Sequence, residues 1–175
     1  MKKLYLSLIV AGALVALLPA AGLAAGASGF PTWSSKFTKG RFTLLPLFNN
    51  EAVLDKETGL VWEQTPSGGI SDWSSAINHC STIEAGGRKG WRLPTVEELG
   101  SVVDTTQSNP ALSASHPFTI GASDTFWSAT TRAAVQTHAW GLSISNGAPQ
   151  NGLTKANVSF KAWCVRGGQG IDGVQ

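Results

Sequence analysis

Residues 90–99 read Gly-Trp-Arg-Leu-Pro-Thr-Val-Glu-Glu-Leu, and this stretch decides how the centre of the chain folds. Pro94 is excluded from a helix interior and biases the residue before it toward an extended backbone. Thr95 is a good helix N-cap, and Glu98 follows it three residues later, as a capping box requires. The sequence therefore predicts an extended segment that stops at Pro94. A short amphipathic helix follows to about residue 104, with an apolar face made by Val96, Leu99 and Val103.

Residues 1–27 have the pattern of a secretory signal peptide. Lys2 and Lys3 form a basic start, an apolar run covers 4–18, and small residues follow to Ala27. The apolar run is shorter than the about 20 residues of a transmembrane helix. We therefore expect an exported protein, periplasmic or extracellular, with no stable membrane insertion once the leader is removed. An uncleaved N-terminal anchor is the alternative.

Removal of this leader leaves a chain without excess charge. The whole sequence has 13 Lys and Arg against 11 Asp and Glu, so the loss of Lys2 and Lys3 leaves 11 of each sign. Nucleic acids and anionic membranes are bound through a surplus of basic side chains, which the mature chain lacks. Nucleic acid is therefore not expected as a partner.

One α+β domain is predicted at 41–168, after a flexible lead-in at 28–40 and before a mobile tail at 169–175. Strands, two helices, a long loop and further strands follow one another, which is typical of α+β proteins and not of alternating βαβ units. The predicted strands are 41–47, 52–54, 60–63, 126–130, 138–144 and 160–166. The first helix runs from a cap at 71 or 72 to residue 80, the long loop is 105–124, and Asn146-Gly147 is a predicted turn.

Cys80 and Cys164 are the only cysteines, and in an exported protein we expect them to form a disulfide. Two buried free thiols are the alternative. His79, His116 and His138 lack the close spacing of a zinc site, and no cluster of acidic and amide oxygens suits calcium. No metal and no cofactor are therefore expected.

Six pieces of the chain, in this order, resemble the Lcl C-terminal domain family. They are Asp55-x-x-Thr58-Gly59-Leu60-Val61-Trp62, Trp73-x-x-Ala76-x-x-x-Cys80, 90–95 with Glu98-Leu99, Phe126-Trp127-Ser128-Ala129-Thr130, Ala139-Trp140 and Trp163-Cys164-Val165-Arg166-Gly167. The resemblance implies a C-type-lectin-like fold, also similar to formylglycine-generating enzymes, with two short helices packed on small antiparallel sheets. It also implies that a first-helix cysteine pairs with a late one. The same resemblance also leads us to expect carbohydrate binding and adhesion at the bacterial envelope, but only as functions found in the family.

Sugar and peptide recognition favours an exposed aromatic ring near amide and charged side chains. We therefore expect the binding surface in the segments 105–124, 131–138 and 145–159. The candidate ligand-binding residues are Arg132, His138, Trp140, Asn146, Gln150 and Asn151. For Trp140 the alternative is core packing, because Leu142 and Ile144 share its strand face. A purely structural role is expected for Trp91, Arg92, Leu93, Pro94, Thr95 and Glu98.

No catalytic residues are predicted, because the sequence has no nucleophile elbow and both cysteines fit the structural bridge. The expected function is that of an exported, non-catalytic binding module of the cell envelope or extracellular space, recognising polysaccharide or a surface protein. Two alternatives are open. The chain is also compatible with a self-associating subunit of an extracellular assembly, or with a degenerate enzyme of the formylglycine-generating type.

Overall fold

The computed structural model describes residues 40–66 and 72–167. The predicted leader at 1–27, the lead-in up to 39 and the tail at 169–175 lie outside these ranges. Within the described ranges, no helix is long and apolar enough to cross a membrane.

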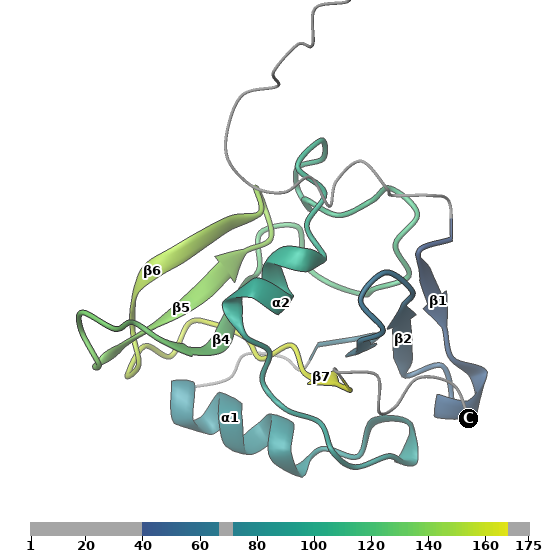
Figure 1. The fold of residues 1–175 in the computed structure, drawn as a ribbon, viewed down its shortest axis with the longest axis horizontal. Coiled ribbons are helices and arrows are strands. Elements are labelled where there is room, and N and C mark those ends of the chain that lie inside the picture. The colour runs from purple at the N-terminus through teal and green to yellow at the C-terminus, as the bar shows by residue number, and fades with distance from the viewer. Residues whose placement is uncertain (1–39, 67–71, 168–175) are drawn as a thin grey trace, which may run out of the picture. The chain divides into compact units, whose positions relative to one another are not determined.

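Two small antiparallel sheets and two helices make up the described fold (Figure 1). The first sheet has the order β1-β2-β3-β7, with β1 at Phe42–Leu44, β2 at Ala52–Asp55, β3 at Val61–Glu63 and β7 at Val165–Arg166. The second has the order β4-β5-β6, with β4 at Thr125–Thr131, β5 at His138–Ser143 and β6 at Ala148–Thr154. Helix α1 is Trp73–Thr82 and α2 is Val96–Ser101, with short 3-10 turns at Pro46–Phe48 and Ala85–Gly87. The predicted α+β class is confirmed.

Both helices begin at the caps that the sequence indicates. The Asp72 side chain accepts a hydrogen bond from the Ser75 backbone N–H at 2.7 Å, which fixes the start of α1. Thr95 and Glu98 form a complete capping box at the start of α2. However, α2 ends at Ser101 and not near residue 104, because the Asp104 N–H turns away to bond the Ala111 carbonyl oxygen at 2.9 Å.

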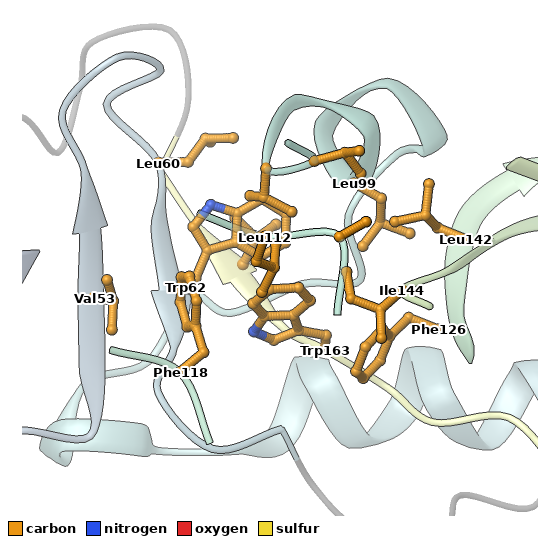
Figure 2. Packing of buried hydrophobic residues seen from close by; sticks show 14 residues of the cluster. Val53, Leu60, Trp62, Leu99, Leu112, Phe118, Phe126, Leu142, Ile144 and Trp163 are labelled. Carbon is orange, nitrogen blue, oxygen red and sulfur yellow. The ribbon is translucent and has the colours of Figure 1, made fainter. Parts of the chain in front are cut away.

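A cluster of tryptophan and phenylalanine rings fills the space between the first sheet, α2 and the second sheet (Figure 2). Trp163 is fully buried at its centre. The centroid of its ring system lies 5.0 Å from that of Trp62, 4.9 Å from that of Phe118 and 5.1 Å from that of Phe126. Leu99 of α2 and Leu142 of β5 belong to the same cluster, so α2 packs on this face of the second sheet.

The segment 161–166 joins the two sheets. The Lys161 N–H bonds the Thr125 carbonyl of β4 at 3.0 Å, and three residues later the Cys164 carbonyl accepts from the Glu63 N–H of β3 at 3.0 Å. Only Val165–Arg166 forms a strand, so the predicted strand at 160–166 is too long. The disulfide between Cys80 and Cys164 is present, and it ties α1 to this segment.

Two other strand predictions are wrong for physical reasons. The first strand stops at Leu44, because Pro46 starts a 3-10 turn. Strand β6 lies in the segment 145–159, for which no strand was predicted. Its sequence contains Pro149 and Gly152, which strands normally avoid. Because β6 is at the edge of its sheet, these residues are tolerated there.

The corner at Pro94 is held by a bidentate ion pair. The Arg92 guanidinium donates to both carboxylate oxygens of Glu98, at 2.7 and 2.6 Å, and the Thr95 backbone N–H donates to the same carboxylate at 2.9 Å. Burial of the Glu98 carboxyl raises its pKa, but the hydrogen bonds from Arg92 and Thr95 outweigh burial and hold the pKa below its usual value. Trp91 and Leu93, on either side of Arg92, are both buried.

At neutral pH we expect Glu98→Gln to lower the free energy of unfolding by about 1–2 kcal/mol, because a half-exposed charge-assisted pair is lost. The folded pKa lies below the reference value of 4.5. The carboxylate's contribution is therefore complete above that value and is lost as the pH falls through the folded pKa. Urea unfolding between neutral pH and about pH 3 should show the difference between variant and wild type shrinking with acidity. Glu97→Gln, at the exposed neighbouring position, is the control; a difference independent of pH would contradict this account.

Candidate functional site

The three-stranded sheet positions most of the candidate ligand-binding residues. Strand β5 lies in its centre, and the Arg132 N–H bonds the His138 carbonyl at 3.0 Å where β4 turns into β5. The Thr131↔Ala139 pairing places Arg132 directly opposite His138. Since directly opposite residues share a sheet face, these two side chains leave the sheet on the same side.

Both neighbours of β5 are irregular opposite Trp140. On the β4 side, Trp127 pairs with Gly141 and Thr131 pairs with Ala139. The three β4 residues 128–130 therefore lie opposite the single residue Trp140. On the other side Ala139 pairs with Leu153 and Gly141 with Gln150, so two β6 residues face it. Bulges of this kind redirect side chains and bend the strand that carries them.

The two faces of β5 have different surroundings. Ala139 packs with Leu153 and other residues of the cluster that contains α1, and a Cβ on Gly141 would lie 2.5 Å from Leu153. Leu142 and Ile144 are buried on the α2 side. Because side chains alternate along a strand, His138 and Trp140 belong to the α2 side as well. They are only half-buried, so the α2 side of the sheet becomes accessible at their end.

We call this accessible region the Trp140 face. Thr130 of β4 lies opposite Trp140 of β5, and Arg132, directly after β4, lies opposite His138. On β6, Thr154 pairs with His138, and Asn151 lies in the bulge opposite Trp140. The Trp140 face therefore consists of Thr130, Arg132, His138, Trp140, Asn151 and Thr154. Four of the six sequence candidates meet here.

The structure does not bring Asn146 and Gln150 to this face. Gln150 pairs with Gly141 and so points to the α1 side of the sheet. Asn146 lies beyond Ser143, at the far end of β5, and its Oδ1 accepts from the Ala148 N–H at 3.1 Å. Three residues of strand, roughly 10 Å, already separate Trp140 from Ser143. Asn146 is thus a turn residue and not a neighbour of Trp140.

The backbone behind Trp140 is held by a buried serine. The Ser128 hydroxyl donates to the Trp140 carbonyl at 2.8 Å, and the indole N–H of Trp73 donates to the Ser128 carbonyl at 2.8 Å. Ser128 is fully buried. Its hydroxyl satisfies a carbonyl that the irregular pairing with β4 would otherwise leave without a partner.

The next two β4 residues attach the sheet to α2. The Ala129 N–H donates to the Pro94 carbonyl at 2.7 Å, and the Thr130 hydroxyl accepts from the Val96 N–H at 3.1 Å. The irregular part of β4 is therefore bonded to the first residue of α2, to α1 through Trp73 and to β5. A site carried on such a framework is organised before its ligand arrives.

The indole N–H of Trp140 has no acceptor within the described part of the chain, and the same is true of the buried indole N–H groups of Trp62 and Trp127. The indole N–H groups of Trp73, Trp91 and Trp163 donate to backbone carbonyls at 2.8–2.9 Å. A ligand at the Trp140 face therefore meets an aromatic ring with a free donor, beside a guanidinium, an imidazole, an amide and a hydroxyl.

A family model for the Lcl C-terminal domain matches residues 51–166. The chain belongs to the Lcl C-terminal domain family. The matched residues include both helices, the whole β4-β5-β6 sheet and both disulfide cysteines. A comparison with curated proteins found no match.

The long loop of this Lcl C-terminal domain, at 105–124, has a different role from the one its length indicates. It has no helix or strand, as predicted, but it contributes Ala111, Leu112 and Phe118 to the core. Its backbone also pairs with the end of the second sheet, since the Ala111 N–H donates to the Ile144 carbonyl at 2.7 Å. Much of the loop is therefore part of the packed interior.

A second polar group in the Lcl C-terminal domain lies beside the disulfide. One ligand-type atom each of Glu63, His79 and Cys164 lies within 4.8 Å of the others. Burial lowers the pKa of His79, and Glu63 is only 5% exposed. In the structure the Cys164 sulfur is bonded to Cys80, so it carries no negative charge with which to bind a metal ion.

Proposed function

We propose that this Lcl C-terminal domain is an exported, non-catalytic binding module whose Trp140 face receives a sugar ring of a polysaccharide. One observation carries the proposal: a half-buried tryptophan with a free indole N–H lies on a strand that is bonded to both helices through β4. Sugar rings bind to the flat face of such aromatic side chains, while nearby guanidinium, imidazole and amide groups orient their hydroxyls.

Export is supported by the buried disulfide and by the leader pattern at 1–27. Disulfides persist in oxidising compartments such as the periplasm and the extracellular space. The path of the disulfide, from α1 to the segment just before β7, supports a C-type-lectin-like arrangement as the finer description of the fold.

Absence of catalysis is supported by the state of the cysteines. Both cysteines of the chain are in the disulfide, so no free thiol is left to act as a nucleophile or a redox group in the folded protein. A formylglycine-generating type of reaction needs reactive thiols. A non-catalytic role therefore agrees better with the folded, oxidised chain.

Binding of the purified protein to a polysaccharide and glycan array, with and without EDTA and at two salt concentrations, tests the proposal. We expect Trp140→Ala to weaken binding to the best glycan by at least about tenfold, which corresponds to about 1.4 kcal/mol. Gln150→Ala is the matched control, because Gln150 lies on the neighbouring strand but points to the other side of the sheet. This control should keep the wild-type affinity.

Two results would contradict the proposal. One is an array without specific binding, which would favour a role in protein assembly. The other is equal weakening by Trp140→Ala and Gln150→Ala, which would place the binding surface elsewhere. Loss of binding in EDTA would show that a metal ion takes part, and it would contradict recognition by side chains alone.

A further inference from the structure

Helix α1 and strand β3 surround the disulfide with two further metal-binding side chains. His79 precedes Cys80 in α1, and Glu63 lies at the end of β3 beside Cys164. The ligand-type atoms of Glu63, His79 and Cys164 are within 4.8 Å of one another. The Cys80 sulfur belongs to the same place, because it is bonded to the sulfur of Cys164. One sulfur, one imidazole and one carboxylate thus converge, and the second sulfur, which is not among the atoms within 4.8 Å of one another, is bonded beside them.

These four groups match the ligand set of a tetrahedral zinc site. Zinc binds thiolate sulfur at about 2.3 Å and imidazole nitrogen or carboxylate oxygen at about 2.0–2.2 Å, which places neighbouring ligand atoms roughly 3.3–3.8 Å apart. The three atoms whose separations are known here lie within 4.8 Å, so shifts on the order of 1 Å complete the geometry for them. The two sulfurs must separate, and rotation of the cysteine side chains about their Cα–Cβ bonds allows this.

We propose that reduction of the Cys80–Cys164 disulfide turns this cluster into a zinc-binding site with Glu63, His79, Cys80 and Cys164 as ligands. A dithiol reductant supplies two electrons and two protons, so the S–S bond breaks, two thiols form and the reductant becomes a disulfide. Zn²⁺ then displaces the two thiol protons and binds both thiolates.

Charge balance favours this exchange. With Glu63 as a carboxylate, the oxidised cluster has a net charge of about −1. Adding Zn²⁺ and removing two thiol protons leaves that net charge unchanged, so the buried cluster gains no uncompensated charge. Without a metal, the reduced state has two neutral thiols in place of the covalent link between α1 and the segment before β7.

The backbone around the cluster is held by bonds other than the disulfide. Glu63 and Cys164 are linked in both directions: the Glu63 N–H donates to the Cys164 carbonyl at 3.0 Å, and the Cys164 N–H donates to the Glu63 carboxylate at 2.9 Å. The other carboxylate oxygen of Glu63 is the one that would bind zinc. On the side of α1, the Asp72 cap and the Trp73 indole fix the helix. These contacts keep the four ligands near one another after reduction.

Cobalt binding to the purified protein tests the proposal. After reduction with a phosphine, which contains no thiol that could bind the metal, Co²⁺ is added under anaerobic conditions. We expect one Co²⁺ per chain, with the intense visible bands of a tetrahedral site and a thiolate-to-cobalt charge-transfer band. The oxidised protein should show neither signal. Added Zn²⁺ should displace Co²⁺ and remove both signals.

His79→Ala and His138→Ala form the matched pair of variants. Each removes one histidine and leaves both cysteines, but only His79 belongs to the cluster. We expect His79→Ala to weaken Zn²⁺ binding by at least about tenfold, and His138→Ala to bind as the wild type does. Near-ultraviolet circular dichroism of the reduced, zinc-bound protein should match that of the oxidised protein.

Three outcomes would overturn the proposal. The first is equal cobalt spectra for the two histidine variants, since the sulfurs alone would then hold the metal. The second is one Co²⁺ shared by two chains. The third is loss of the near-ultraviolet signal in the reduced protein despite excess Zn²⁺, which would mean that the metal does not replace the disulfide as a cross-link.

Discussion

Replacing Trp163 with alanine is expected to lower the free energy of unfolding by about 3–5 kcal/mol. Trp163 is fully buried, and its ring lies within 5.1 Å, centroid to centroid, of those of Trp62, Phe118 and Phe126. Its indole N–H also donates to the Glu63 carbonyl at 2.9 Å, and this acceptor would lose its partner. A domain of this size has about 5–15 kcal/mol of stability in total, so the variant should lose a large share of it.

Urea unfolding followed by circular dichroism measures this effect, and Trp140→Ala is the control. Both variants remove one indole, but Trp140 is half-buried on the sheet face and belongs to neither core cluster. We expect Trp140→Ala to cost about 1 kcal/mol or less. Equal losses in the two variants would contradict the central place of Trp163 in the core.

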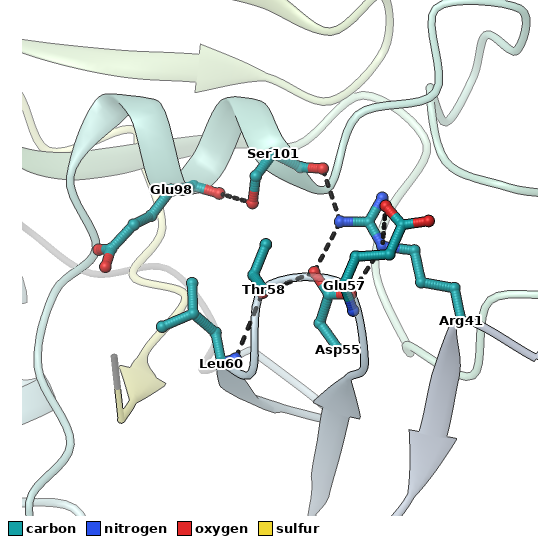
Figure 3. Close-up of polar contacts among 7 residues, drawn as sticks. All are labelled: Arg41, Asp55, Glu57, Thr58, Leu60, Glu98 and Ser101. Carbon is teal, nitrogen blue, oxygen red and sulfur yellow. Dashed lines mark hydrogen bonds and ion pairs between the residues drawn. The ribbon is translucent and has the colours of Figure 1, made fainter. Parts of the chain in front are cut away.

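Asp55→Asn is expected to destabilise the domain by about 3–5 kcal/mol, because it leaves a buried guanidinium without its main counter-charge. Arg41 donates from Nε to Asp55 Oδ1 at 2.7 Å and from Nη2 to Oδ2 at 2.6 Å, and Nη2 also donates to the Ser101 carbonyl at 2.8 Å (Figure 3). Arg41 is 4% exposed and Asp55 is fully buried. The pair therefore connects the first hairpin with the end of α2.

The double variant Arg41→Met with Asp55→Leu distinguishes the contribution of the ion pair to stability from that of side-chain packing. Replacing both partners of a buried pair with apolar side chains removes the desolvation cost together with the attraction. Glu57, whose carboxylate lies 3.4 Å from Arg41 Nε, should reduce the penalty of the single variant slightly. We expect the double variant to be more stable than Asp55→Asn in urea unfolding. A double variant that is less stable than Asp55→Asn would contradict this expectation.

Local signals in the sequence predicted the parts of the fold whose causes are local. The turn between β2 and β3 has Gly59 at a positive φ of 72°, a conformation that glycine adopts without strain. The N-caps at Asp72 and Thr95 depend on residues no more than three positions away. The disulfide follows from the presence of only two cysteines. Such features need no knowledge of distant contacts.

The missed features depend on distant contacts. Strand β6 has a weak strand sequence and forms because β5 offers it hydrogen-bonding partners. The core role of Leu112 and Phe118 has no periodic signal, since both lie in a loop. The Arg41–Asp55 pair joins the residue before β1 to the last residue of β2, and nothing in the spacing of single charges along the chain distinguishes it from exposed pairs.

The sequence indicated which residue types to consider for a binding surface, but not how those residues lie relative to one another. The sequence pattern of an aromatic residue with polar residues nearby predicted Trp140, Arg132, His138 and Asn151 as candidates. Strand pairing puts these four residues at neighbouring positions. The alternation of β5 predicts that Trp140 shares a face with Leu142, which belongs to the core cluster on the α2 side. The irregular pairing on both sides of Trp140, which brings Asn151 to this face and directs Gln150 away, depends on register and could not be inferred from one strand alone.

The position of Trp163 near the end of the matched domain has a consequence for synthesis. A ribosome makes the protein from its N-terminus, so the rings of Trp62, Phe118 and Phe126 are all made before the Trp163 ring that packs against them. Until Lys161–Arg166 is added, the two sheets also lack the hydrogen bonds that join them. A nascent chain is therefore unable to close its interior early, and it stays open until translation of the domain is nearly finished.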